Sequence, residues 1–180
     1  MNKELSNEKL KEEFIKYFGV DKWNQENELE KLTEFHLKLC KDYNLDSIPL
    51  IVENISEDSR YDIQNDCIII SENVVSNYKE ALKCVIHETR HMYQRMVVEL
   101  EITSHPLYQV WYDNFKEAHS ADPNNINQIE DYFKQPIEID AFAFTKYIFR
   151  KYFNEDLICF DLMIEDIFNL YIEKYLNNGL

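Results

Sequence analysis

The chain has 180 residues, a net charge of −15 at pH 7 and only two glycines. The negative charge argues against a nucleic-acid backbone or an anionic membrane surface as the main partner. The scarcity of glycine disfavours glycine-rich phosphate loops and an extensive β architecture. A chain of this length fits one domain, so we expect a single domain over residues 1–180.

Cysteine usage and the N-terminal sequence favour an intracellular protein. Four cysteines lie far apart and form no Cys-x-x-Cys pair: Cys40, Cys67, Cys84 and Cys159. This spacing is typical of reduced, packed thiols in a cytosolic protein. The first residues are polar and charged, and no apolar run reaches transmembrane length. We therefore expect a cytoplasmic protein without a signal peptide or a membrane span.

The periodicity of apolar residues predicts mainly helices. Helices are expected over residues 4–18 and 25–43, and three strands follow at 48–52, 61–63 and 67–71. A helix over 74–99 comes next, and the rest of the chain predicts helices at 107–118, 126–133, 136–152 and 160–177. We therefore expect a predominantly helical α+β fold, with a small three-stranded sheet directly before the helix over 74–99.

The helix expected over 74–99 contains His87-Glu88-Thr89-Arg90-His91, an H-E-x-x-H pentad. Residues four apart share a helix face, so the two histidines can direct imidazole nitrogens at one metal ion. Glu88 lies about 100° further round the helix and can reach a water molecule bound to that ion. Zinc lowers the pKa of such a water, and a carboxylate can take its proton. The pentad therefore predicts a zinc centre.

The other residues of this helix fit a metal site on one face. Apolar side chains gather opposite His87, as expected for a helix with its back to a core: Tyr78, Ala81, Leu82, Val85, Met92 and Met96. The histidine side is mostly polar and holds Glu80, Lys83, Cys84, His91 and Gln94. A surface helix with ion pairs is the alternative explanation. Cys84 is either a packed thiol or a further ligand.

Two positions compete for the third ligand. Glu138 lies on the helix expected over 136–152 and shares its face with Phe142 and Phe149. A carboxylate among aromatic rings is costly to bury unless it is paired or bound to a metal. Asp140 lies on the other side of that helix and fits a first-turn residue favoured by the helix dipole. The rival is His105, 14 residues after His91.

The pentad on a helix resembles the zincin superfamily of metallopeptidases. This resemblance implies a short mixed sheet before the active helix, a third ligand further along, and an edge strand that pairs with substrate backbone, the role of residues 67–71. Glu138 followed by Ala141 and Phe144 is similar to the E-x-x-A-x-x-F signature of small gluzincins, including the ImmA/IrrE-type peptidases. The spacing of His105 instead resembles the SprT-like proteases, which use a third histidine and act at DNA.

We therefore expect a zinc-dependent metallopeptidase of the small gluzincin type, which hydrolyses peptide bonds of a peptide or protein substrate. His87, His91 and Glu138 would bind Zn²⁺, and Glu88 would act as the general base. The oxyanion of the reaction also needs a stabilising group. By chemistry alone the candidates are Tyr132, Tyr112 and His119.

Two other hypotheses stay open at this point. The protein could be a metal-binding interaction module that cleaves nothing, or a helical structural protein in which the pentad arose by chance. The SprT-like alternative, with His105 as third ligand, would keep the peptidase activity and change the site. Substrate, oligomeric state and biological process leave no signal in the sequence.

Overall fold

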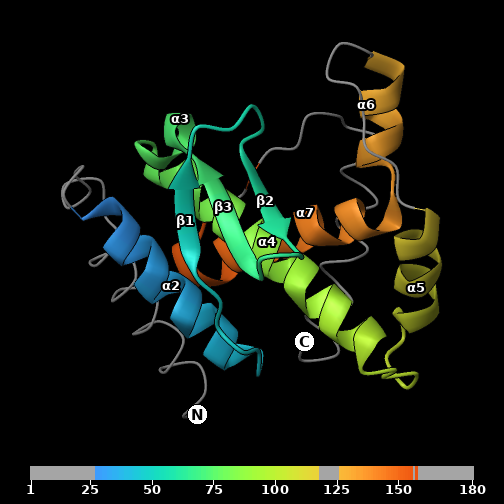
Figure 1. The fold of residues 1–180 in the computed structure, drawn as a ribbon. Coiled ribbons are helices and arrows are strands. Elements are labelled where there is room, and N and C mark those ends of the chain that lie inside the picture. The colour runs from blue at the N-terminus through green and yellow to red at the C-terminus, as the bar shows by residue number, and fades with distance from the viewer. Residues whose placement is uncertain (1–26, 118–125, 156, 158–180) are drawn as a thin grey trace.

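The computed structural model describes residues 27–117, 126–155 and 157 (Figure 1). The helices predicted over 4–18 and 160–177 lie outside the described residues, as do His119 and Cys159. A sheet of three strands lies across one long central helix, and further helices flank that helix on its other sides (Figure 1). The predicted class, a mainly helical α+β fold with the sheet before the H-E-x-x-H helix, is confirmed.

The described helices and strands follow the predicted order. Helix α2 (Glu28–Asp42) precedes the strands β1 (Leu50–Glu53), β2 (Ser59–Asp62) and β3 (Cys67–Ser71). The short α3 (Glu72–Val75) leads into the long α4 (Tyr78–Glu99). The remaining elements are α5 (Tyr108–Glu117), α6 (Ile126–Phe133), α7 (Pro136–Ile148) and the π-helix η2 (Phe149–Phe153). Among the described residues, no helix has the length and apolarity to cross a membrane.

Strand β3 is the central strand of the sheet, not an edge strand. The strand order is β1-β3-β2, with β1 parallel and β2 antiparallel to β3. Ile68 of β3 lies opposite both Leu50 and Tyr61, and all five residues of β3 are buried. The expectation that 67–71 offers free backbone to a substrate is therefore wrong. The continuous apolar run of β3 is typical of a strand covered on both faces and paired on both sides.

The helix predicted over 74–99 is divided into α3 and α4. Asn77 has an extended backbone, with φ −99° and ψ 102°, and its side-chain oxygen accepts a hydrogen bond from the Lys79 N–H at 3.2 Å. Ser71 caps α3 in the same way through the Asn73 N–H. Serine and asparagine are favoured caps because they satisfy amides that a helix start leaves open. The second cap gives α4 its own start, two turns before the pentad.

Helix α4 is the centre of the core. Its residues Ala81, Leu82 and Val85 are fully buried, in the same apolar cluster as Phe35 of α2 and Ile68 of β3. This is the apolar face that the sequence predicts. Three of the four cysteines, Cys40, Cys67 and Cys84, are buried free thiols, as expected for packed cysteines.

Helix α7 runs against α4 and carries Glu138 in its first turn. It begins at Pro136, where a missing N–H costs nothing, and the next free amide, that of Ile137, donates to the Asn114 side chain of α5 at 2.9 Å. After Ile148 the helix continues as the π-helix η2. This π-helix is terminated by Asn154, whose backbone lies in the left-handed region with φ 54°. Most of α7 is buried, so its polar residues Glu138 and Asp140 need partners inside the protein.

Candidate metal centre

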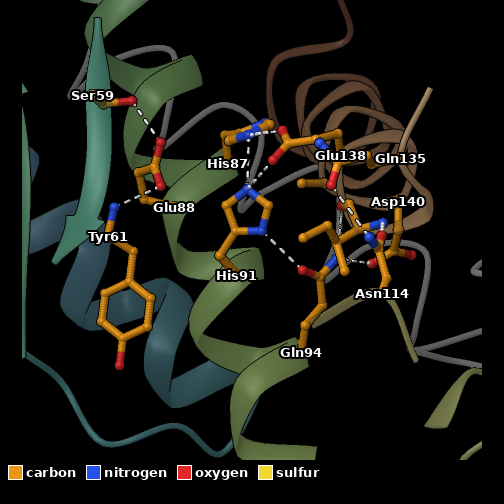
Figure 2. A network of polar contacts seen from close by, with 12 residues as sticks. Ser59, Tyr61, His87, Glu88, His91, Gln94, Asn114, Gln135, Glu138 and Asp140 are labelled. Atoms are coloured by element: carbon orange, nitrogen blue, oxygen red, sulfur yellow. Dashed lines mark hydrogen bonds and ion pairs between the residues drawn. The ribbon is translucent and has the colours of Figure 1, made fainter. Parts of the chain in front are cut away.

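His87 and His91 stand one turn apart on α4 and point toward Glu138 of α7 (Figure 2). The Nε2 atom of His87 lies 3.1 Å from Glu138 Oε2, and that of His91 lies 3.5 Å from Glu138 Oε1. The two Nε2 atoms are 3.0 Å apart. The three residues expected as ligands from the sequence thus present one donor atom each, all within 4.8 Å of one another.

These separations fit a small cation at the centre of the three groups. Zinc bonds of about 2.0–2.1 Å in a tetrahedral site place neighbouring ligand atoms about 3.3 Å apart. The separations of 3.0, 3.1 and 3.5 Å lie close to that value. The set combines two imidazole nitrogens with one carboxylate and leaves a fourth tetrahedral position to water or substrate. Such a donor set can hold a metal ion and leave it open to a further ligand.

The electrostatics of the group favour positive charge between its members. Burial by itself lowers the pKa of His91, but the charges of Glu138 and Glu88 and hydrogen bonds to its ring raise it to about 9. Burial by itself raises the pKa of Glu138, because it disfavours the charged carboxylate. The imidazoles of His91 and His87 nevertheless hold this pKa well below its usual range. A metal ion and a proton therefore compete for the same position on His91.

Glu88, the expected general base, faces strand β2. Its carboxylate accepts hydrogen bonds from Ser59 Oγ at 2.7 Å and from the Tyr61 N–H at 2.8 Å (Figure 2). Because that amide points to α4 and not to β3, the outer edge of β2 lies beside the pentad. Nothing in the sequence distinguishes Ser59 from other serines, since its role depends on contact between a strand and a helix 29 residues further along.

His105 does not belong to the group. Its ring stacks on Trp111, with 4.5 Å between the ring centroids, and its Nδ1 accepts the Leu107 N–H at 3.1 Å. Burial lowers the pKa of His105, and the nearby Arg90 charge adds to this effect. The turn after α4 places His105 against Trp111, which belongs to a second apolar cluster. The SprT-like alternative thus lacks its third ligand.

Cys84 is also not one of the three grouped donors. Burial, aided by the negative charge of Glu88, raises the pKa of its thiol to about 12. Its place one turn before His87 therefore reflects packing into the core.

Of the three candidates for oxyanion stabilisation, Tyr132 of α6 lies at the site. Burial raises its pKa, and so do the charge of Glu138 and a hydrogen bond to that carboxylate. Tyr112 stacks on Tyr108 of α5 and lies under the Lys116 ammonium group, 4.0 Å from its ring centroid. His119 lies outside the described residues.

Beneath the histidines lies a buried polar network that no local sequence pattern predicts. Asp140 is fully buried and accepts two hydrogen bonds from the Arg90 guanidinium, at 2.8 and 3.2 Å. Its interpretation as a first-turn residue stabilised by the helix dipole is therefore insufficient, because α4 covers that side of α7. Gln94 also donates to Asp140, at 2.7 Å, and contacts His91. The only signal was that Arg90 and Gln94 lie four residues apart, one turn along α4.

No family model, curated protein or solved structure matches this chain. The chemistry of the centre is therefore inferred from its own residues. They supply a His-His-Glu group able to hold a metal ion. The buried carboxylate of Glu88 follows His87 on α4, and Tyr132 lies beside Glu138.

Proposed function

We propose that the protein is a zinc-dependent metallopeptidase of the small gluzincin type. The observation that carries this proposal is the convergence of His87 and His91, from one H-E-x-x-H turn, with Glu138 from a helix 47 residues later. Two imidazoles and a carboxylate are a ligand set that suits zinc. The substrate class that follows from this chemistry is a peptide or a protein.

In this proposal each nearby side chain has a separate task. Bound Zn²⁺ would supply an acidified water molecule and polarise the peptide carbonyl. Glu88 takes the proton of the attacking water and later delivers it to the leaving amine. Tyr132, whose hydroxyl lies beside Glu138, is the group best placed to donate a hydrogen bond to the developing oxyanion.

The site also suggests where an extended substrate would lie. Strand addition gives affinity through backbone hydrogen bonds and requires a free strand edge. Strand β2 ends the sheet on the side of Glu88, and its Ser59 and Tyr61 already contact that carboxylate. A substrate strand along β2 would lie close to the general base and would have to take over the Tyr61 N–H that now donates to Glu88.

A second candidate function is a metal-binding interaction module without catalytic activity. Both oxygens of Glu88 already accept hydrogen bonds from β2, at 2.7 and 2.8 Å, and the residue is only 5% exposed. In this alternative Glu88 joins α4 to β2, as the metal joins α4 to α7. The peptidase proposal requires the carboxylate to exchange at least one of these bonds for one to water.

Metal analysis and one substitution separate these functions. Protein purified without chelators is expected to carry close to one zinc ion per chain, measured by elemental analysis. Glu88→Gln should keep the zinc and lower the hydrolysis of an unfolded protein substrate by roughly 10²-fold or more, the usual effect of losing a general base. Zinc binding with equal, background hydrolysis in both proteins would favour the interaction module. Protein that takes up no zinc would refute both.

A further inference from the structure

Gln94 is a fully buried amide one turn beyond His91 on α4. Its carbonyl oxygen Oε1 lies 2.8 Å from His91 Nδ1. Its amide nitrogen Nε2 donates to the Ile137 carbonyl at 2.9 Å and to Asp140 Oδ2 at 2.7 Å (Figure 2). Both N–H groups and the oxygen of Gln94 are therefore used inside the protein.

The orientation of this amide is set by its partners. A backbone carbonyl and a carboxylate oxygen can only accept hydrogen bonds, so both must face the NH₂ group of Gln94. Turning the amide over would place Oε1 against two acceptors and leave buried polar groups unsatisfied, which is costly. The carboxylate of Asp140 is itself held by the Arg90 guanidinium, so it is fixed as well.

This orientation determines which nitrogen of His91 carries a proton. The Oε1 atom of Gln94 can only accept, so His91 Nδ1 must be the donor. A neutral imidazole has a single N–H group, and its other nitrogen then has a free lone pair. In His91 that nitrogen is Nε2, the atom that faces His87 and Glu138. The amide thus selects the tautomer of His91 that can bind a metal in this group.

The same amide also holds the helix of the third ligand. Ile137 precedes Glu138 in the chain, and Asp140 follows it by two residues, so Gln94 is bonded on both sides of the Glu138 position. His87 lacks such support, because its Nδ1 is buried without a hydrogen-bond partner in the described part of the chain. Of the two histidines, His91 is therefore the one whose ring is oriented by a hydrogen bond to its Nδ1 atom.

We propose that Gln94 is a positioning residue of the metal centre, which commits His91 to coordination through Nε2 and fixes its spacing from Glu138. This inference rests on the proposed zinc site. Groups that orient metal-bound histidines usually change metal affinity by 10- to 100-fold when they are replaced. Gln94 differs from a purely structural residue because its oxygen accepts a hydrogen bond from His91, while its nitrogen donates hydrogen bonds to α7.

Two substitutions at this position separate the two tasks. Gln94→Met removes both the acceptor and the donors, whereas Gln94→Glu keeps an acceptor for His91 Nδ1 and places a carboxylate against Ile137 O and Asp140. Gln109→Met, at an exposed position on α5, is the control. Three measurements apply to each protein: zinc affinity by competition with a chromogenic chelator, long-range ¹H–¹⁵N NMR of the histidine rings with zinc bound, and thermal unfolding without metal.

We expect Gln94→Met to weaken zinc binding by roughly 10- to 100-fold and to weaken or abolish the Nδ1–H signal of His91. Gln94→Glu should unfold at a lower temperature yet keep zinc affinity within a few-fold and retain that signal. The inference is overturned if zinc affinity follows unfolding temperature in both variants, or if Gln94→Met binds zinc like the control. Failure of the parent protein to bind zinc would instead overturn the proposed function, and this inference with it.

Discussion

On the side of α4 that faces α2 and the sheet the contacts are mainly apolar, whereas the side that faces α7 carries charged and amide groups deep in the protein. Toward α2, Leu32 and Phe35 share a core with Leu82. Toward α7, Glu138 and Asp140 bring two carboxylates to histidines, an arginine and a glutamine of α4. The two sides of α4 therefore pack with opposite chemistry, and the histidines on the α7 side keep partial exposure.

The difference bears on what each side contributes. A fully buried leucine or phenylalanine contributes about 1.5–3 kcal/mol to folding through apolar transfer. Buried ion pairs gain little net stability, because desolvation offsets most of their attraction. The apolar contacts of α4, which include those with Phe144 and Ile148 of α7, can therefore supply the stability of the fold, while the polar groups toward α7 are held at fixed positions at a cost. That cost is understandable if the α7 side has a function.

The largest expected effect separates the candidate ligands. Glu138→Ala should weaken zinc affinity by several orders of magnitude, because two protein ligands hold zinc poorly. His105→Ala should change it little, since His105 packs against Trp111 away from the group. Calorimetric zinc titration of both variants tests this. Loss of zinc from His105→Ala with retention in Glu138→Ala would reverse the assignment.

The second prediction concerns the cost of the polar side. Asp140→Ala removes the carboxylate that accepts from the fully buried Arg90. Breaking a buried ion pair on one side costs about 3–5 kcal/mol, so urea unfolding should show a loss of that size. Glu57→Ala is the matched control, because its pair with Arg60 is exposed and contributes at most about 1 kcal/mol. Similar losses in the two variants would show that Arg90 does not depend on Asp140.

The same division explains what could be predicted from the sequence. The apolar spacing of α4 and the H-E-x-x-H pentad are local patterns, and they located the central helix and its histidines. The cost of burying Glu138 among aromatic rings pointed to a partner, and the structure brings this residue to the histidines. Each of these inferences needs only a helical period or the chemistry of one side chain.

The missed features depend on contacts that no local pattern encodes. The resemblance implied an edge position for residues 67–71, whereas the central position of β3 follows from its parallel pairing with β1, which no local pattern encodes. In the sequence, nothing distinguishes Gln94 and Asp140 from other polar residues. Their hydrogen bond forms only because α4 packs against α7. Asn77 is a favoured helix cap and could have indicated the break before α4. The helical period of apolar residues continues across it, so one helix was predicted over 74–99.

The smallest expected effect uses one histidine from each side of α4. His36 of α2 is fully buried, and its Nδ1 lies 3.1 Å from the Thr89 hydroxyl of α4. Burial lowers its pKa from 6.5 to about 4, against a smaller opposing effect from the Ile48 backbone. For His91, on the α7 side, the acidic neighbours outweigh burial and raise the pKa from 6.5 to about 9. The two sides therefore favour opposite charge states of the same side chain.

These shifts predict two opposite slopes in the stability of the metal-free protein. Between pH 6.5 and about 4 the unfolded chain binds a proton at His36 that the folded protein refuses, so the free energy of unfolding falls as pH falls. Between pH 6.5 and about 9 the folded protein keeps a proton on His91 that the unfolded chain releases, so the free energy of unfolding falls as pH rises. For His36 this amounts to about 3 kcal/mol over its range.

Urea unfolding across this pH range, with a chelator present, measures both slopes. His36→Gln should flatten the acid side relative to the parent protein and leave the alkaline side unchanged, and His91→Gln should do the reverse. Saturating zinc should remove the alkaline slope in the parent protein, because a metal-bound imidazole no longer takes up the proton. A parent protein whose alkaline slope is unchanged by zinc would show that His91 does not bind it, even if zinc binds elsewhere. The pH dependence thus tests separately whether the α2 side keeps its histidine neutral and whether the α7 side holds a cation.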